Sequence, residues 1–130
     1  MTRRTHQRTA AFVALYQREV NPRPLDELLP RDTSPFTREL AEGALEHAEV
    51  IDPLIERHAT GWTLERIAPL ERSILRVALF ELLYRPDVPD EVAIDEAVEA
   101  AKELCGAEAP AFVNGILGAA HRERHAEAPG

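Results

Sequence analysis

The sequence is poor in the features that build disulfide-rich, membrane-spanning or β-sheet proteins. Its 130 residues include one cysteine, Cys105, so no disulfide forms within the chain and a reducing cytoplasm is expected. No apolar run is long enough to span a membrane, and no apolar stretch follows the arginine-rich start to complete a signal peptide. Aromatic residues make up only 5%, and segments with strand-like alternation are missing. These absences favour a cytoplasmic protein built from helices.

What the sequence does contain fits a single globular domain. Hydrophobic residues make up 45% and charged residues 29%, as in ordinary soluble domains. A chain of this length can bury one core but not two independent ones. Alanine, leucine, glutamate and arginine dominate, and all four favour helices. We expect one all-α domain over residues 1–125 and a flexible tail over residues 126–130.

Charge is distributed unevenly along the chain. The formal net charge is −8, which taken alone argues against a nucleic acid as partner. Residues 1–18 carry four arginines and no acidic residue, so the remaining 112 positions carry −12. A basic arm on an acidic body predicts two partner surfaces of different chemistry. A solvated, frayed N-terminus accounts for the arm equally well.

The first predicted helix covers residues 4–20, and its two ends differ. Arg4 and Arg8 lie on nearly the same stripe as Phe12 and Tyr16, each one turn from the next. The helix therefore begins basic and ends apolar.

Local signals predict where several later helices begin and end. Ser34-Pro35 combines a cap with a first-turn proline and opens a helix over residues 36–51. Asp52-Pro53 repeats the signal, which predicts a break and a new short helix there. Gly43 lowers helix stability, so it indicates a close contact with another helix.

The last third of the chain contains the strongest helical patterns. Apolar residues on nearly all sides of segment 69–84 predict a central buried helix. Segment 94–105 has one apolar and one acidic side, and Pro110 starts a final helix. The whole chain is expected to form about seven helices, some of them very short.

No group of residues has the spacing of a catalytic or metal site. His121 and His125 share a helical face, but no third ligand accompanies them, so we interpret them as solvated tail residues and predict no metal site. Asp95 and Glu96 are adjacent on a helix and cannot flank one substrate atom, and Cys105 lies on an apolar stripe. A glycine-rich phosphate loop and a nucleophile elbow are missing. We expect neither an enzyme nor a cofactor.

Signals for nucleic-acid binding lie near both ends of the chain. Arg3, Arg4 and Arg8 can contact phosphates or stack on unpaired bases. Phe112 and Asn114 lie at the expected start of the last helix, where backbone amides point outward and a splayed-out base can be recognised. The pattern alone favours core packing for Phe112 and a local backbone hydrogen bond for Asn114.

One set of motifs is specific enough to identify a family. Its C-terminal members are Ile74-Leu75-Arg76-Val77-Ala78-Leu79-Phe80-Glu81-Leu82, Val88-Pro89, Ala93-Ile94-Asp95-Glu96-Ala97-Val98, Ala101-Lys102 and Phe112-Val113-Asn114-Gly115-Ile116-Leu117. Its N-terminal members are Arg8 and Ala14-Leu15-Tyr16-Gln17. Together they closely resemble the NusB family of bacterial transcription antitermination factors. The resemblance covers essentially the whole chain.

The resemblance implies an all-α fold of two three-helix bundles, without catalysis. It also implies that the chain pairs with NusE, which is a protein of the small ribosomal subunit too. The pair would bind single-stranded boxA RNA and join other Nus factors on RNA polymerase to suppress premature termination in ribosomal RNA operons. By position, the residues that match RNA-contacting sites are Arg3, Arg4, Arg8, Phe112 and Asn114. Those that match positions near the NusE surface are Tyr16 and Glu71.

The sequence departs from the family pattern at two places, and two other functions remain compatible with it. Thr5, His6 and Gln7 interrupt the arginine segment, so we expect weak RNA binding by the chain alone and tighter binding with NusE. Asp95 stands where the family often has asparagine. The alternatives are an accessory RNA-binding domain of a ribosomal RNA methyltransferase and a scaffold that binds only proteins. A monomer and a homodimer are both compatible with the sequence.

Overall fold

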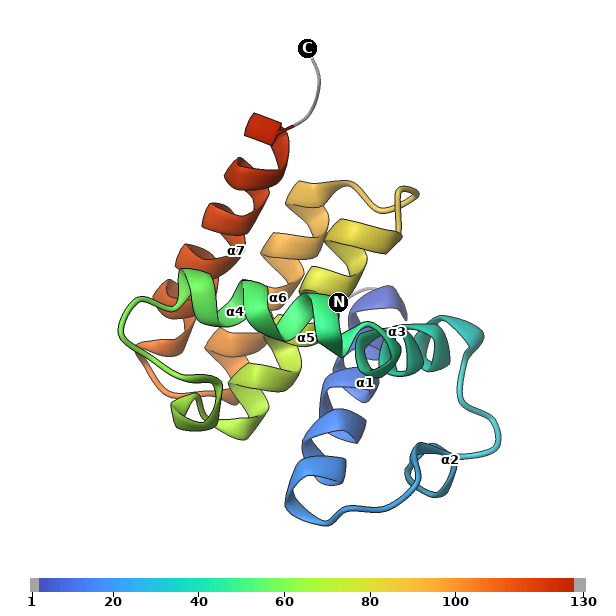
Figure 1. The fold of residues 1–130 in the computed structure, drawn as a ribbon. Helices are drawn as coiled ribbons and strands as arrows, with labels where there is room; N and C mark the ends of the chain where they lie inside the picture. Colours follow the sequence, from blue (N-terminus) through green and yellow to red (C-terminus); the bar gives the residue numbers. More distant parts are fainter. Residues whose placement is uncertain (1–2, 128–130) are drawn as a thin grey trace.

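The computed structural model describes residues 3–127, which form seven α-helices and one short 3₁₀ helix (Figure 1). In chain order these are α1 (Arg3–Val20), α2 (Leu25–Leu28), α3 (Pro35–Glu46), α4 (Ala48–His58), η1 (Leu64–Arg66), α5 (Pro69–Tyr84), α6 (Asp90–Leu104) and α7 (Ala109–Glu127). No strand occurs within residues 3–127, so the prediction of an all-α protein is confirmed. Within the same residues, no helix combines the length and the apolar character needed to cross a membrane.

Helix α5 is the centre of the fold (Figure 1). It packs against α1, α3, α4, α6 and α7, and most of its side chains are buried. Helices α1 and α3 pack on each other and on α5 to form one bundle of three. Helices α6 and α7 form the second bundle with α5, and α4 lies across α5 and α7. The predicted arrangement of two three-helix bundles around a central buried helix is confirmed.

Local sequence signals set two of the helix starts as predicted. The hydroxyl oxygen of Ser34 accepts a hydrogen bond from the backbone N–H of Thr37 at 3.1 Å, and Pro35 occupies the first turn of α3. Pro69 occupies the first turn of α5 in the same way. These residues act within a single turn of helix, which is why the sequence alone identifies them.

The break between α3 and α4 lies earlier than predicted. Helix α3 ends at Glu46, and Pro53 lies inside α4 rather than at its start. At the corner between the two helices, the His47 ring stacks on the Tyr84 ring with centroids 3.9 Å apart. The turn therefore coincides with a contact to the end of α5. Cap and proline signals do not record such a long-range contact, so the predicted break at Asp52-Pro53 is wrong.

The close helix contact predicted at Gly43 is confirmed. A Cβ atom at this position would lie 2.2 Å from two carbon atoms of the Phe80 ring. A side chain at this position would require the Phe80 ring or α3 itself to move. The missing side chain thus sets how closely the first bundle packs on the central helix.

Helix α7 extends further than the predicted domain. It continues through Glu127, so residues 126–127 of the predicted tail are helical. Residues 128–130 lie outside the described part of the chain. His121 and His125 lie on this helix, which packs against α4, α5 and α6.

Candidate RNA and protein-partner surfaces

The first surface is the basic end of α1, where Arg3 and Arg4 are exposed. The guanidinium carbon of Arg4 lies 3.7 Å from the centroid of the Phe36 ring on α3, which is a cation–π contact. Arg3 lines a shallow hollow that the start of α3 completes. Neither arginine forms an ion pair within residues 3–127. Their charges are therefore available to an anionic partner. We call these two residues the arginine end.

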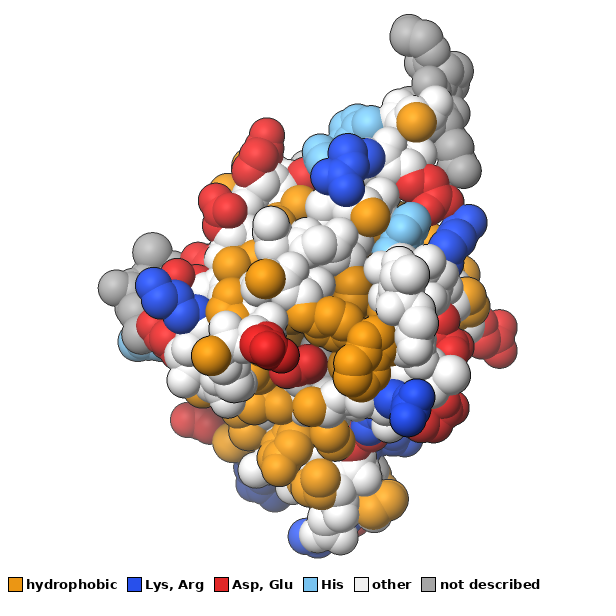
Figure 2. All heavy atoms as spheres, turned by 90° about the vertical axis from the view of Figure 1, so that its left-hand side faces the viewer, with side chains coloured by type: hydrophobic (Ala, Val, Ile, Leu, Met, Phe, Trp, Pro, Cys, Tyr) orange, Lys and Arg blue, Asp and Glu red, His pale blue; other side chains and the backbone are white. Residues whose placement is uncertain are grey.

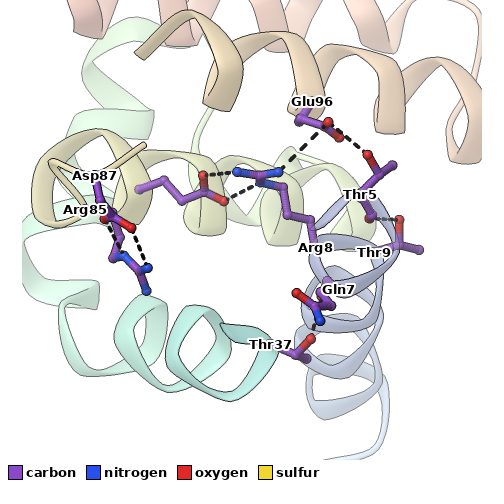
Figure 3. Close-up of polar contacts among 9 residues, drawn as sticks. Thr5, Gln7, Arg8, Thr9, Thr37, Arg85, Asp87 and Glu96 are labelled. Atoms are coloured by element: carbon purple, nitrogen blue, oxygen red, sulfur yellow. Dashed lines mark hydrogen bonds and ion pairs between the residues drawn. The ribbon is translucent and has the colours of Figure 1, made fainter. Parts of the chain in front are cut away.

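Arg8 is placed differently from the expectation that it contacts RNA. It is only 4% exposed, and its Nε and Nη2 atoms lie 2.8 and 3.0 Å from the two carboxylate oxygens of Glu81 (Figure 3). Glu81 is 1% exposed, and Nη1 of Arg8 lies 3.9 Å from Oε1 of Glu96. This two-pronged contact occupies the guanidinium with carboxylates of α5 and α6. In this arrangement Arg8 does not present its charge to an RNA phosphate.

Polar contacts on both sides of α1 hold the helix in place beside Arg8. The Thr5 hydroxyl donates a hydrogen bond to Oε1 of Glu96 at 2.9 Å (Figure 3). The Thr37 hydroxyl donates to the backbone carbonyl of Gln7, also at 2.9 Å. Helix α1 is therefore tied to α6 and to α3 within its first two turns. The two residues of the arginine end therefore lie on a helical turn whose position is fixed by these hydrogen bonds.

A third guanidinium near Phe36 is neutralised by acids. The guanidinium carbon of Arg85 lies 5.3 Å from the Phe36 centroid. Its Nε and Nη2 atoms each lie 2.9 Å from a carboxylate oxygen of Asp87 (Figure 3). Its Nη1 donates to Glu39. The hydrogen bonds from Arg85 lower the pKa of Asp87 to about 2. Among the described cations around this ring, only Arg4 forms no ion pair with a carboxylate, although its charge contributes to lowering the pKa of Asp87.

The other flank of α1 is acidic. A groove between α1 and α6 is lined on the α1 side by Thr5, Thr9 and Phe12. Its α6 side carries four carboxylates, namely Asp95, Glu96, Glu99 and Glu103. These charges repel a phosphate backbone. The arginine end is therefore bordered by negative charge on the side that faces α6.

The second surface is a hollow at the start of α7, which we call the Trp62 hollow. Phe112 and Glu71 line it together with Trp62, Arg66 and Glu108. The Trp62 ring meets Phe112 edge-on with centroids 6.2 Å apart, and Trp62 is 51% exposed. Figure 2 shows hydrophobic side chains gathered in the middle of the face that carries α7, with acidic side chains beside them. Such a surface suits a partner that offers apolar and basic groups.

Burial raises the pKa of Glu71 in the Trp62 hollow and of Cys105, which does not line it. Partial burial raises the pKa of Glu71, because the carboxylate loses water. Burial and the negative charge of Glu71 both raise the pKa of Cys105 at the end of α6. The thiol therefore stays protonated at neutral pH and lacks the character of a nucleophile.

The start of α7 differs from the sequence-based expectation. The helix begins at Ala109, so the backbone N–H of Phe112 donates to the carbonyl of Glu108 at 3.3 Å. Asn114 lies in the second turn and is exposed. The expectation that both residues lie among outward-pointing backbone amides is wrong. Any contact that they make with a base comes from the side chains alone.

Tyr16 lies at the opposite end of α1 from the arginine end. The 12 residues between Arg4 and Tyr16 correspond to about 18 Å of helix. Glu19, one turn after Tyr16, forms ion pairs with Arg72 and Arg76 of α5 at 2.5 and 2.6 Å. Because Arg72 follows Glu71 directly, the half-buried Tyr16 lies at the same end of the molecule as Glu71. The two residues assigned to the NusE surface are thus brought to one end.

The residues assigned to RNA are divided between the two surfaces. Arg3 and Phe112 line hollows that share no residue. Phe112 lies beside Glu71, which the resemblance assigns to the partner protein. The Trp62 hollow therefore combines residues expected to contact RNA with a residue expected to contact NusE.

Sequence reasoning missed Glu81 and Trp62. Glu81 carries a charge in the apolar middle of the central helix, and a buried carboxylate needs a cation beside it. That rule could have shown that Glu81 needs a cation beside it, but not that the cation is Arg8. Trp62 is the only tryptophan of the chain and follows Gly61 in the connection between α4 and η1. Its pairing with Phe112 joins positions that lie 50 residues apart, and no local pattern marks it.

Residues 5–122 of the chain match the model of the NusB family. The chain belongs to the NusB family. Among its relatives, the transcription antitermination protein NusB of Thermobifida fusca is 46% identical over 117 residues, which cover 85% of this chain and 82% of that protein. The NusB protein of Frankia casuarinae is 60% identical over 84 residues, which span 65% of this chain and 62% of that protein.

Solved NusB structures have the same fold. T. maritima NusB is 37% identical and superimposes with a TM-score of 0.84, covering 94% of this chain and 92% of that one. A chain in a complex of the antitermination factors NusB and NusE with double-stranded RNA is 27% identical, with a TM-score of 0.82. That match covers 95% of this chain and 99% of the other. The helical architecture described above is therefore the architecture of NusB proteins.

Proposed function

We propose that this chain is an RNA-binding transcription antitermination factor that acts together with NusE. Membership of the NusB family supports the proposal, as does the likeness to a chain bound to NusE and RNA. The observation that carries the RNA part is the arginine end, where Arg3 and Arg4 are exposed and form no ion pair with any residue between positions 3 and 127. The proposal includes no catalytic step and no cofactor. It places the protein in the cytoplasm, where bacterial transcription takes place.

The proposed RNA surface combines charge and stacking. Arg3 and Arg4 would neutralise phosphates, while Phe112 and Asn114 would contact an unpaired base by stacking and hydrogen bonding. Arg8 would act on this surface only indirectly, because its ion pair with Glu81 fixes the helix that carries the arginine end. RNA binding by the chain alone is expected to be weak, since few free cations contribute.

The proposed NusE surface contains Tyr16 and Glu71 and carries negative charge. An acidic body complements a basic ribosomal protein, and the exposed Trp62 offers an aromatic anchor beside Glu71. Phe112 lies in the same hollow, so a bound NusE would reach the proposed RNA-contacting residues. Other Nus factors and RNA polymerase would then join through the assembled complex.

Fluorescence anisotropy with labelled RNA tests the proposal. We expect weak binding of single-stranded boxA RNA by the chain alone and tighter binding when NusE is added. A double-stranded RNA of the same sequence, measured in parallel, separates the single-stranded preference from general affinity for RNA. No gain in affinity from NusE would overturn the proposal.

A scaffold that binds only proteins gives a different result in the same assay. Its complex with NusE would form with unchanged affinity in the presence of RNA, and the double variant Arg3→Ala/Arg4→Ala would leave the salt dependence of RNA recruitment unchanged. A protein that uses the arginine end loses part of that dependence.

A further inference from the structure

A cluster of three metal-ligating side chains lies where the C-terminal half of α7 meets the start of α6. His121 and His125 lie one turn apart on α7, and Asp90 is the first residue of α6. Oδ2 of Asp90 lies 3.1 Å from Nδ1 of His121 and 3.1 Å from Nε2 of His125. The sequence pattern predicted no third ligand for the two histidines, but the fold supplies one from 35 residues away.

The separations suit a small divalent cation. Zinc binds imidazole nitrogens and carboxylate oxygens at about 2.0–2.2 Å, so two ligand atoms in a tetrahedral shell lie about 3.3 Å apart. Both separations from Asp90 Oδ2 are close to this value, and all three ligand atoms lie within 4.8 Å of one another. Small side-chain rotations of the histidines would complete the arrangement without moving the helices.

Hydrogen bonding does not fully account for the cluster. His125 is within hydrogen-bond distance of Asp90 through Nε2. Nδ1 of His121 is buried and makes no hydrogen bond in the described part of the chain, although it points to the same carboxylate oxygen. A buried nitrogen without a well-aligned hydrogen bond is poorly satisfied, and a metal ion at this point would give it a ligand bond.

The surroundings fix the position of α7 at this point. The Nη1 atom of Arg124 donates to the backbone carbonyl of Leu82 at 2.7 Å, which ties α7 to α5. Glu123 forms ion pairs with Arg57 and His58 of α4. Both arginines and Glu123 line a hollow together with Asp90 and His121. The ligand-bearing turn is therefore held on two sides, and histidine side chains gather near the C-terminal end of the chain in Figure 2.

We propose that Asp90, His121 and His125 form a binding site for a divalent transition-metal ion, with zinc as the best-fitting ion. Two nitrogens and one oxygen are ligands that zinc accepts, and a water molecule would complete the shell. The bound ion would join the start of α6 to the end of α7. It would stabilise the native fold, because an unfolded chain does not hold the three ligands together. The site does not depend on the proposed RNA-related function.

Isothermal titration of the untagged, chelator-treated protein with zinc chloride tests the site. We expect one zinc ion per chain and a higher thermal unfolding temperature when zinc is present. Asp90→Asn and His125→Ala should each weaken zinc binding by at least about tenfold, since each removes one of three ligands. Loading with cobalt(II) should produce visible absorption bands of a four-coordinate N/O site in the native protein, and these should be lost in the variants.

Two control variants make the test specific. His6→Ala removes an exposed histidine of α1, and His58→Ala removes the histidine that pairs with Glu123 beside the site. Both should leave zinc affinity within about twofold, which is the scatter expected for residues that do not ligate. Unchanged zinc affinity in His121→Ala/His125→Ala overturns the proposal. So does the absence of zinc binding to the native protein, or binding that is lost in Cys105→Ser or His58→Ala instead.

Discussion

Arg4 and Arg8 lie one turn apart on α1, but one guanidinium lies over an aromatic ring at the surface and the other is held by a buried carboxylate. The difference comes from what faces each residue. Phe36 of α3 lies under Arg4, whereas Glu81 of the central helix faces Arg8. Residue type and helical spacing are the same in both cases, so the role of each arginine is decided by the neighbouring helices. A surface cation and a structural cation can therefore occupy one basic segment.

The largest effect is expected from removing the structural cation. Arg8→Ala leaves Glu81 buried without a partner, which should lower the free energy of unfolding by about 3–5 kcal/mol. Urea denaturation followed by circular dichroism measures the loss. The double variant Arg8→Met/Glu81→Leu should recover much of it, because it removes both charges together. A loss below about 1 kcal/mol in Arg8→Ala would show that the pair does not hold α1 to α5.

Removing the surface cations should affect binding and not stability. Arg3→Ala/Arg4→Ala should reduce the slope of log affinity for RNA against log salt by up to about 1.5, since about 0.7 is lost per contact with single-stranded RNA. The free energy of unfolding should stay within about 1 kcal/mol of the native value, because only the exposed cation–π contact of Arg4 with Phe36 is lost. Arg18→Ala/Arg23→Ala removes the same charge from exposed positions at the other end of α1 and just after it, and should leave the slope unchanged. Equal slopes in both double variants would contradict the division between Arg4 and Arg8.

The Trp62 hollow differs from the arginine end because aromatic rings, those of Trp62 and Phe112, are its main contact groups. Phe112→Leu keeps an apolar side chain but removes the ring, and should weaken the RNA complex formed with NusE by about 1–2 kcal/mol if a base stacks there. Trp62 is the only tryptophan, so its fluorescence reports on this hollow directly. A change in Trp62 emission on adding NusE is expected in the native protein. Unchanged emission and unchanged affinity in Phe112→Leu would exclude the hollow from the interface.

The smallest effect is expected on the pH dependence of stability, through the partly buried carboxylate of Glu71 in the same hollow. Because burial raises the pKa of Glu71, the folded protein binds its proton more tightly than the unfolded chain does. Its contribution to stability is therefore present at low pH and is lost as pH rises through the raised value. Glu71→Gln should remove this decline, which is measured by thermal unfolding across the acidic range. Glu108→Gln, on the same hollow, controls for the loss of one charge.

How far the sequence predicts the molecule depends on the distance over which each interaction acts. Ser34 and Pro69 start their helices through contacts within one turn, so their patterns were sufficient. The bend at His47 depends on Tyr84, and the burial of Arg8 depends on Glu81, which lies 73 residues away. Contacts between residues so far apart in the sequence are indicated there only indirectly, for example by one acidic residue in an otherwise apolar helix.

The candidate sites follow the same rule. The resemblance assigned Tyr16 and Glu71 to one partner, and the fold brings them to one end of the molecule. It could not show that Phe112 lies beside Glu71, because that placement depends on the packing of α7 against α5. In the same way, Asp90 joins His121 only once α6 and α7 are packed together.

Sharing one helix between two bundles has a consequence for how the molecule opens. Neither bundle can separate without exposing one side of α5, whose residues Ile74, Leu75 and Val77 are fully inaccessible to water. Partial unfolding of one half therefore removes support from the other, and the protein should unfold cooperatively as one unit. Backbone amides of α5 should exchange their hydrogens with solvent at the rate of global unfolding, and those at the end of α7 much faster. The helices that carry the arginine end and the Trp62 hollow both pack on α5, so the two surfaces should keep a fixed position relative to each other.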